Sequence, residues 1–321
     1  MQKTHFKIVS LIAFFAVFAL FVVFIFNSIP VKAAQASVNL GTATPFAILA
    51  GTPNITDAGN ASVIQGNVGL SPSSGAGIGL NCSQVTGAIY SVDATGPLCR
   101  INNGPLMVTA KNDLTAAYVD VAGRTPLTTV PTELGGTTLV SGVYDSASTT
   151  FDITAGAGAL VLDGQNDPSS VFIFQAPFSG NGLNVGSGST VSLINGAQAC
   201  NVFWRVDSAS INTTATFVGN VLALNSISVA NGATIQGRLL ARNGNVTLIN
   251  DTITVPQCTD GTGTGGSSGS GGGTGTGTAV IPGFPNTGDS KGSLVLFIGI
   301  SALFILCVSV LGFVVYKQHR R

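Results

Sequence analysis

Short stretches of alternating apolar and polar residues fill the region from residue 201 to residue 255, and glycine, asparagine or aspartate separates them. Alternation of this kind is typical of β-strands with one buried face. The stretches form three consecutive groups of three, which cover residues 201–219, 220–237 and 238–255. A repeat of about 20 residues with three strands per repeat predicts a β-solenoid, in which stacked coils share one core.

The same repeat occurs nearer the N-terminus. Residues 60–66 (NASVIQG) are almost a copy of residues 232–237 (GATIQG), and residues 188–193 (GSTVSL) fit the same pattern. We therefore expect the N-terminal and C-terminal regions to belong to one solenoid that is interrupted between them.

The interruption contains one amphipathic helix, predicted to follow Gly104 and Pro105 and to end near Gly123. Proline is favoured in the first turn of a helix and glycine just after its last turn. One face of this helix is apolar, and we expect that face to pack along a flat side of the solenoid. The residues of the predicted face are Leu106, Ala110, Leu114, Tyr118 and Val121.

The first 36 residues have the pattern of a secretory signal. Lys3 and Lys7 precede an apolar run over residues 8–26, and the small-residue sequence AQA occupies residues 34–36. Such a segment is removed during export, here after Ala36. Because the apolar run is long for a signal peptide, an uncleaved membrane anchor is the alternative. Both interpretations place the following residues outside the cytoplasm.

The C-terminal region has the pattern of a surface attachment. Residues 259–283 are rich in glycine, serine and threonine and predict a flexible linker. The apolar run over residues 294–316 is long enough for a transmembrane helix, and the KQHRR sequence after it favours a cytoplasmic end.

Residues 284–321 resemble the cell-wall sorting signal of Gram-positive surface proteins, in which a Leu-Pro-x-Thr-Gly motif precedes a membrane helix and a basic tail. The resemblance implies cleavage by sortase between Thr287 and Gly288 and attachment to peptidoglycan. Without cleavage, the membrane helix itself would anchor the protein. The motif residues are Phe284, Pro285, Asn286, Thr287 and Gly288, of which Phe284 replaces the leucine of the family.

Residues 37–258 remain as one extracellular domain, which is large enough for a single core. Lysine and arginine are fewer there than aspartate and glutamate, so the domain lacks the basic stripe that nucleic-acid binding requires. Both histidines, His5 and His319, lie outside it. A Ser-His-Asp triad and a Cys/His metal site are therefore excluded, and we expect no cofactor.

Paired carboxylates remain the one conceivable enzymatic arrangement, because they can cleave sugars. Turn formation is the favoured interpretation, particularly for Asp163 and Asp167, which flank a Gly-Gln-Asn sequence. We also expect Arg205, Arg238 and Arg242 to be solvated at strand ends, and one of Phe203 and Trp204 to point into the core. The carboxylate candidates are Asp145, Asp152, Asp163, Asp167 and Asp207.

Four cysteines lie in the exported domain, and an even number favours disulfides. They allow three pairings. Cys82 with Cys99 would close a short loop, and Cys200 with Cys258 would clasp the C-terminal region, so we favour these two bonds. Four free thiols are the alternative.

Several stretches of residues 38–258 resemble the ice-binding-protein-like family, the domain known as DUF3494. The resemblance implies a right-handed β-solenoid of triangular cross-section with one long helix alongside, which is an all-β fold apart from that helix. It also implies coils that do not follow sequence order, with the N-terminal region inserted among later coils. The stretches are residues 40–51, 64–72, 110–124, 171–175, 194–206 and 237–248.

Characterised members of that family bind ice through a flat face with a loose motif of Thr, Ala or Gly, any residue, and Thr or Asn. Here the motif falls on residues 213–216 and 231–234, with weaker matches at 187–190, 249–252 and 59–62. We expect Asp251 to point outward, where its charge would disturb an ice-like water layer. The predicted ice-binding residues are Ser62, Ser187, Thr190, Thr213, Thr216, Asn231, Thr234 and Thr252.

The favoured function is therefore adsorption of a cell-surface protein to ice or to ordered water. An adhesin that binds a glycan or another cell with the same scaffold is the first alternative. A structural surface protein without a specific ligand is the second.

Overall fold

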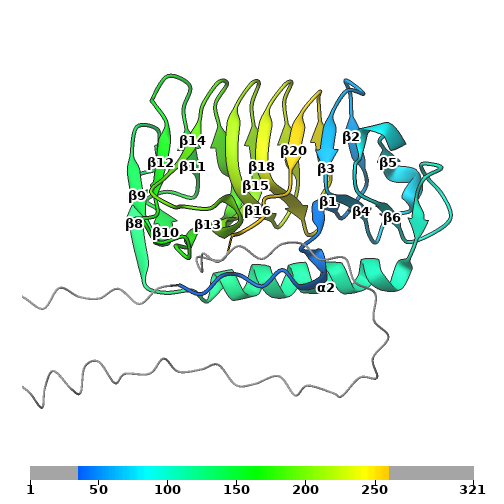
Figure 1. Cartoon of the computed structure of the whole chain (residues 1–321), viewed down its shortest axis with the longest axis horizontal. Helices are drawn as coiled ribbons and strands as arrows, with labels where there is room; N and C mark the ends of the chain where they lie inside the picture. Colours follow the sequence, from blue (N-terminus) through cyan, green and yellow to red (C-terminus); the bar gives the residue numbers. More distant parts are fainter. Residues whose placement is uncertain (1–34, 260–321) are drawn as a thin grey trace, which may run out of the picture. The chain divides into compact units, whose positions relative to one another are not determined.

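Three ladders of parallel strands run side by side through the structure, a computed structural model that describes residues 35–259 (Figure 1). Each coil in the middle of the stack adds one strand to each ladder. All strand pairs among the described residues are parallel, as expected for stacked coils. The predicted mainly-β fold with one long helix is thereby confirmed.

The first ladder lies next to the helix. It contains, in spatial order, β8 (Leu127–Val130), β10 (Gly142–Ser146), the first part of β13 (Phe172–Val185), the first part of β15 (Val202–Ile211), the second parts of β16 (Thr216–Ala223) and β18 (Thr234–Ala241), then β1 (Phe46–Ala50), β4 (Asn67–Leu70), β6 (Ile89–Ser91) and β7 (Ile101–Asn102).

The second and third ladders are built from shorter strands. The second contains β11 (Phe151–Ile153), the second parts of β13 and β15, β17 (Ile227–Val229), β19 (Val246–Leu248), β2 (Ile55–Asp57) and β5 (Ile78–Gly79). The third contains β9 (Thr138–Val140), β12 (Leu160–Asp163), β14 (Val191–Ile194), the first parts of β16 and β18, β20 (Thr252–Thr254) and β3 (Val63–Gln65).

The order of the coils departs from sequence order at one seam. There β1, β2 and β3 pair with β18, β19 and β20, so the first coil of the chain stacks directly on its last coil. The non-sequential order was expected. The expected insertion of the N-terminal region among the later coils was wrong. The N-terminal coils instead stack on the outer side of the last coil, at one end of the structure.

Helix α2 (Gly104–Ala122) carries the chain from β7 at one end of the stack to β8 at the other (Figure 1). Its 19 residues span about 28 Å, or about six steps between neighbouring strands. The Asn103 side chain caps its first turn by accepting a hydrogen bond from the Leu106 N–H at 3.1 Å. The predicted apolar face is correct except at its start, where Met107 is buried and Leu106 is only partly covered.

Two apolar clusters hold the fold together, one inside the coils and one between α2 and the first ladder. Because strand residues alternate in direction, neighbours in sequence serve different clusters. Trp204 points into the coils, where its ring stacks on Phe174 at 3.9 Å between centroids and its indole N–H donates to the Val218 carbonyl. Phe203 packs toward the helix instead. The prediction that one of this pair points inward is confirmed.

Two of the three repeats end in a glycine that close packing between coils requires. Gly219 and Gly237 are paired in the ladder, and a Cβ on Gly237 would lie 1.8 Å from the Gly219 carbonyl oxygen. Gly219 itself has a φ of 119°, and a Cβ there would meet the Trp204 indole nitrogen at 2.7 Å. Only glycine fits either position without a shift of the backbone.

The interface between α2 and the first ladder holds more charge than the sequence suggested. The expectation that Arg238 is solvated is wrong: its side chain is 5% exposed and donates to the Thr44 carbonyl and to Asn220 Oδ1. Tyr118 lies between two guanidinium groups, with Arg205 at 4.4 Å and Arg242 at 4.8 Å from its ring centroid. These cation–π contacts join the helix to two coils that are separated by one further coil.

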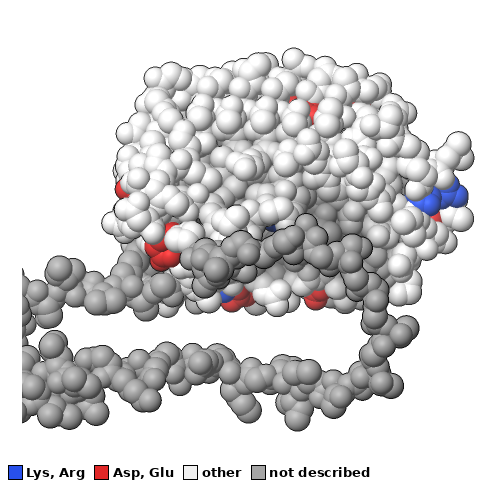
Figure 2. All heavy atoms as spheres, viewed as in Figure 1, with Lys and Arg blue, Asp and Glu red and all other residues white. Residues whose placement is uncertain are grey.

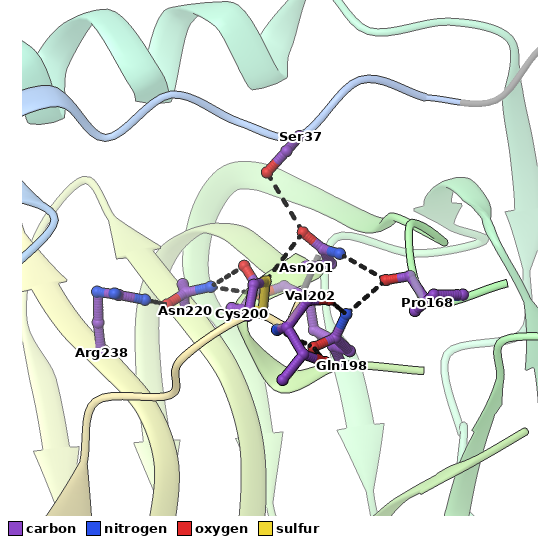
Figure 3. The surroundings of a disulfide bond; sticks show 10 residues. Ser37, Pro168, Gln198, Cys200, Asn201, Val202, Asn220 and Arg238 are labelled. Atoms are coloured by element: carbon purple, nitrogen blue, oxygen red, sulfur yellow. Dashed lines mark hydrogen bonds between the residues drawn. A yellow bond between two sulfur atoms is a disulfide. The ribbon is translucent and has the colours of Figure 1, made fainter. Parts of the chain in front are cut away.

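Both predicted disulfides are present. Cys82 bonds to Cys99 and Cys200 bonds to Cys258, with Cα separations of 5.9 and 5.7 Å. Around the second bond, side-chain amides connect segments distant in sequence. Asn201 contacts Ser37 and Pro168 (Figure 3). Gln198 contacts Thr259. The first and last described segments of the chain therefore meet beside this disulfide.

The predicted signal sequence, most of the linker, the sorting motif and the C-terminal apolar run lie outside the described residues. Within residues 35–259, no helix has the length and apolar character needed to cross a membrane.

We predict that the double change Cys200→Ser and Cys258→Ser lowers the free energy of unfolding more than the change Cys82→Ser and Cys99→Ser. The two bonds close loops of 58 and 17 residues, and loop-closure entropy makes them worth about 4 and 3 kcal/mol. Urea unfolding of the parent and both variants measures the difference. A larger loss for the shorter loop would contradict this account.

Candidate functional site

The predicted threonines lie in one row on the third ladder. Thr190 bridges to Thr216, Thr216 pairs with Thr234, and Thr234 pairs with Thr252. The residues that follow them, such as Phe217 and Ile235, point into the core. Alternation therefore turns the threonine side chains outward, at the strand spacing of about 4.7 Å.

Three further predicted residues lie three positions earlier in the chain, at the corner between the second and third ladders. Ser187, Thr213 and Asn231 are all exposed. Two residues after each of them comes a buried small residue, Ser189, Ala215 and Ala233 respectively. Positions one and four of the four-residue motif thus face solvent together, and position three fills the corner from inside.

Position two of the motif takes a left-handed backbone in four successive coils. The φ angles are 69° at Gly188, 57° at Thr214, 78° at Gly232 and 54° at Asn250. This conformation turns the chain sharply from the second ladder to the third. It favours glycine and asparagine, which occupy three of the four positions.

Ser62 does not belong to the threonine row, and the prediction for this residue is wrong. β3 pairs with β20 so that Val63 lies beside Thr252. Ser62 is 1% exposed, and its hydroxyl accepts a hydrogen bond from the Asp251 N–H. The left-handed residue of the turn before β3 is Asn60, which lies three residues before Val63. In the other coils the left-handed residue lies two residues before the threonine of the row, so the register here is shifted by one residue.

Asp251 points inward, contrary to expectation. It is 1% exposed, and its carboxylate accepts hydrogen bonds from the N–H groups of Ala233 and Ile249, each at 2.8 Å. Burial raises the pKa of this carboxyl to about 6, and the nearby Asp57 carboxylate adds to the rise, although the two N–H donors favour the charged form. The objection that a charge interrupts the outer face therefore no longer applies.

The outer surface formed by these residues, from β14 to β3, is called the threonine face below. Its members are Ser187, Thr190, Thr213, Thr216, Asn231, Thr234, Ile249, Thr252 and Val63. None carries a charge. In the view of Figure 2, acidic and basic side chains gather mainly at the helix side and at one end of the stack, and most of the surface above the helix is uncharged.

Sequence reasoning missed two apolar members of the threonine face. Val63 is 44% exposed and Ile249 is 36% exposed, although both types are usually buried. The signal for Ile249 was its motif position, since it stands where the repeat has Thr213 and Asn231. No comparable signal identified Val63, because its register depends on the turn at Asn60.

The second ladder also turns small polar residues outward. Asn184, Ser210, Ser228, Thr247 and Thr56 follow one another in register. That row continues into charged residues, because Asp152 pairs with Asn184 and Glu133 bridges to Asp152. The threonine face is free of such charges over the coils named above.

Four of the five carboxylates considered for catalysis are engaged in local hydrogen bonds. Asp163 accepts from the Gln165 N–H and Asp167 from the Ser169 N–H, which confirms the turn role predicted for both. Asp152 accepts from Asn184, and Asp207 accepts from Asn225. Within residues 35–259, no group of three or more histidine, cysteine or acidic residues is placed to hold a metal ion.

The family model described as ice-binding-like matches residues 48–254, which is more than half of the chain. The chain belongs to this ice-binding-like family. An ice-binding protein of Flavobacterium frigoris (strain PS1) is 41% identical over 227 residues, which cover 68% of this chain and 77% of that protein. An ice-binding protein of a Colwellia species is 43% identical over 237 residues, which cover 72% of this chain and 89% of that protein.

Solved structures of the family share the fold. An ice-binding protein from an Antarctic biological consortium matches with a TM-score of 0.60 and 36% identity, over 72% of this chain and 97% of that one. The DUF3494 domain of Shewanella frigidimarina ice-binding protein 1 matches with a TM-score of 0.61 and 31% identity, over 70% of this chain and 100% of that one. Since these solved chains consist almost wholly of the matched region, residues 35–259 contain what the fold needs.

We predict that Asp251 makes part of the stability depend on pH. Its folded pKa is raised above the usual 3.8, so its contribution is complete below about pH 4 and is lost as the pH rises through 6. A shift of this size corresponds to at most about 3 kcal/mol. The parent should lose this contribution between pH 4 and pH 7, whereas Asp251→Asn has no carboxyl to titrate there. The difference in unfolding free energy between the two proteins should therefore shrink over this range, and a constant difference would contradict the role given to Asp251.

Proposed function

We propose that this protein binds ice through the threonine face. The observation that carries the proposal is the uncharged row of Thr190, Thr216, Thr234 and Thr252, in register on a chain whose relatives are ice-binding proteins. The face would adsorb to an ice crystal, or to the ordered water at its surface.

The chemistry of the row supports adsorption to a regular solid. Threonine is β-branched and stiff at χ1, so its hydroxyl and methyl lose little freedom on binding. Water-mediated contacts are nearly as favourable as direct ones. A rigid array of hydroxyl and methyl groups repeated at about 4.7 Å can therefore hold an ordered water layer, with many weak contacts made at once.

The apolar members fit the same role. Val63 and Ile249 continue the face without adding a charge, and charged groups would hold their own hydration shells. The buried Asp251 keeps its carboxylate away from this surface. We propose further that the threonine face is one flat side of a right-handed, triangular solenoid, as the family resemblance implies.

We also propose that the protein works at the cell surface. The export signal, the linker and the sorting-like motif support this location, with attachment to peptidoglycan by sortase or to the membrane by the C-terminal apolar run. The last described residue, Thr259, contacts Gln198 beside the Cys200–Cys258 bond, and the threonines lie at the opposite ends of the third-ladder strands. The last described residue therefore lies away from the threonine row.

An adhesin that binds a glycan or another cell is the second candidate. The row of Asn184, Ser210, Ser228, Thr247 and Thr56 favours it, because amides and hydroxyls on a rigid scaffold are the groups that bind sugars. Its acidic continuation at Asp152 and Glu133 distinguishes that surface from the threonine face. An enzymatic role has less support, since four of the five candidate carboxylates bond locally within turns and between coils.

We predict that residues 35–259 keep ice crystals small at low micromolar concentration and that Thr216→Tyr with Thr234→Tyr abolishes this effect. Two tyrosines would project from the row and prevent close contact with a flat crystal plane. Recrystallisation is followed by microscopy after annealing just below the melting point.

Thr109→Tyr with Asn112→Tyr is the matched control, because both residues are exposed on α2. This control should keep the full effect. Crystal growth that the folded parent does not restrain would reject ice as the ligand, and glycan binding by the parent would then favour the adhesin.

A further inference from the structure

Thr214 occupies a backbone position that its side chain disfavours. The described residues include six non-glycine positions with positive φ, and Thr214 is the β-branched one among them. The other five are asparagine or glutamine, and asparagine tolerates this conformation well. In the neighbouring coils the equivalent position is Gly188 on one side and Gly232 on the other.

Packing inside the protein does not account for this residue. Thr214 is exposed, and its hydroxyl donates to the carbonyl of the preceding Thr213 at 2.7 Å. Its N–H already bonds to the Asn231 carbonyl through the backbone, which glycine would do equally well. A threonine here therefore strains the backbone without filling any part of the core.

The Thr214 side chain lies between two positions that carry no side chain, Gly188 and Gly232. A Cβ placed on Gly188 would lie 4.0 Å from Thr214 Oγ1, and a Cβ placed on Gly232 would lie 3.8 Å from Thr214 Cγ2. The hydroxyl thus lies toward one glycine and the methyl toward the other. Thr214 fills a gap along the corner that both neighbouring coils leave open, directly beside Thr213 of the threonine face.

We propose that Thr214 is a contact residue of the ice-binding face, kept in an unfavourable backbone conformation because its side chain touches the crystal. The inference rests on the function proposed above and adds an exposed residue at position two of the motif, outside positions one and four. The internal hydrogen bond to Thr213 fixes the rotamer, so the methyl and the free lone pairs of the hydroxyl are held in place before binding.

Two substitutions distinguish the contribution of the Thr214 side chain to binding from the cost of its strained backbone to stability. Thr214→Gly removes both, so the melting temperature should rise while the concentration needed to restrain recrystallisation rises several-fold. Thr214→Ala removes the contact but keeps a Cβ at positive φ, so activity should fall similarly without the gain in stability. Opposite movement of stability and activity in the glycine variant is the expected result.

Gln165→Gly is the matched control. Gln165 is exposed, has a φ of 53°, and lies in the turn after β12, at the far end of the third-ladder strands. Its replacement should raise the melting temperature and leave the activity unchanged.

Three results would overturn the proposal. Full activity of Thr214→Gly beside an active parent would show that the side chain makes no contact. An unchanged melting temperature of Thr214→Gly would show that the backbone is not strained. An inactive parent would reject the proposed function itself, and that failure is recognised from the parent measurement alone.

Discussion

The fold depends on the seam at which β1, β2 and β3 pair with β18, β19 and β20. This contact joins the first coil of the chain to its last and turns two separate stacks into one continuous core. This pairing also makes a long connecting element such as the helix necessary. After the N-terminal coils, the chain must return along the whole stack before it can form the remaining coils, and α2 is the straight element that spans most of this distance.

Polar side chains secure the seam from within. Asp251 of the last coil binds backbone N–H groups of its own coil and of the preceding one, and Ser62 of the first coil accepts from the Asp251 N–H. Asp57 accepts from the N–H groups of Ser62 and Asn250, and so links both sides again. These buried carboxylates lie beneath the threonine face, so stability and the proposed binding surface are built from the same turns.

The corner between the second and third ladders gives the face its geometry. A left-handed residue turns the chain, a small buried residue fills the angle, and the residues on either side of this pair are left pointing outward. Because each coil repeats this turn, the outward residues form rows at the spacing of the strands. Most coils have glycine or asparagine at the left-handed position. Threonine at 214 is the exception, and we infer that its side chain is the reason for its presence.

Much of this could be predicted from the sequence, because short-range patterns determine it. Alternation gives strands, repeated glycine gives corners, Pro105 and Gly123 delimit the helix, and spacing in the repeat put Thr216 above Thr234. What the sequence could not determine was decided by contacts between distant segments. The turn at Asn60 moved Ser62 inside and Val63 outside, and the seam with the N-terminal coil buried Asp251. Arg238 became buried because Asn220 and the Thr44 carbonyl, 18 and 194 residues away in sequence, offered it hydrogen bonds. The direction of a side chain at a turn depends on which coil stacks against it, and only the tertiary structure establishes that.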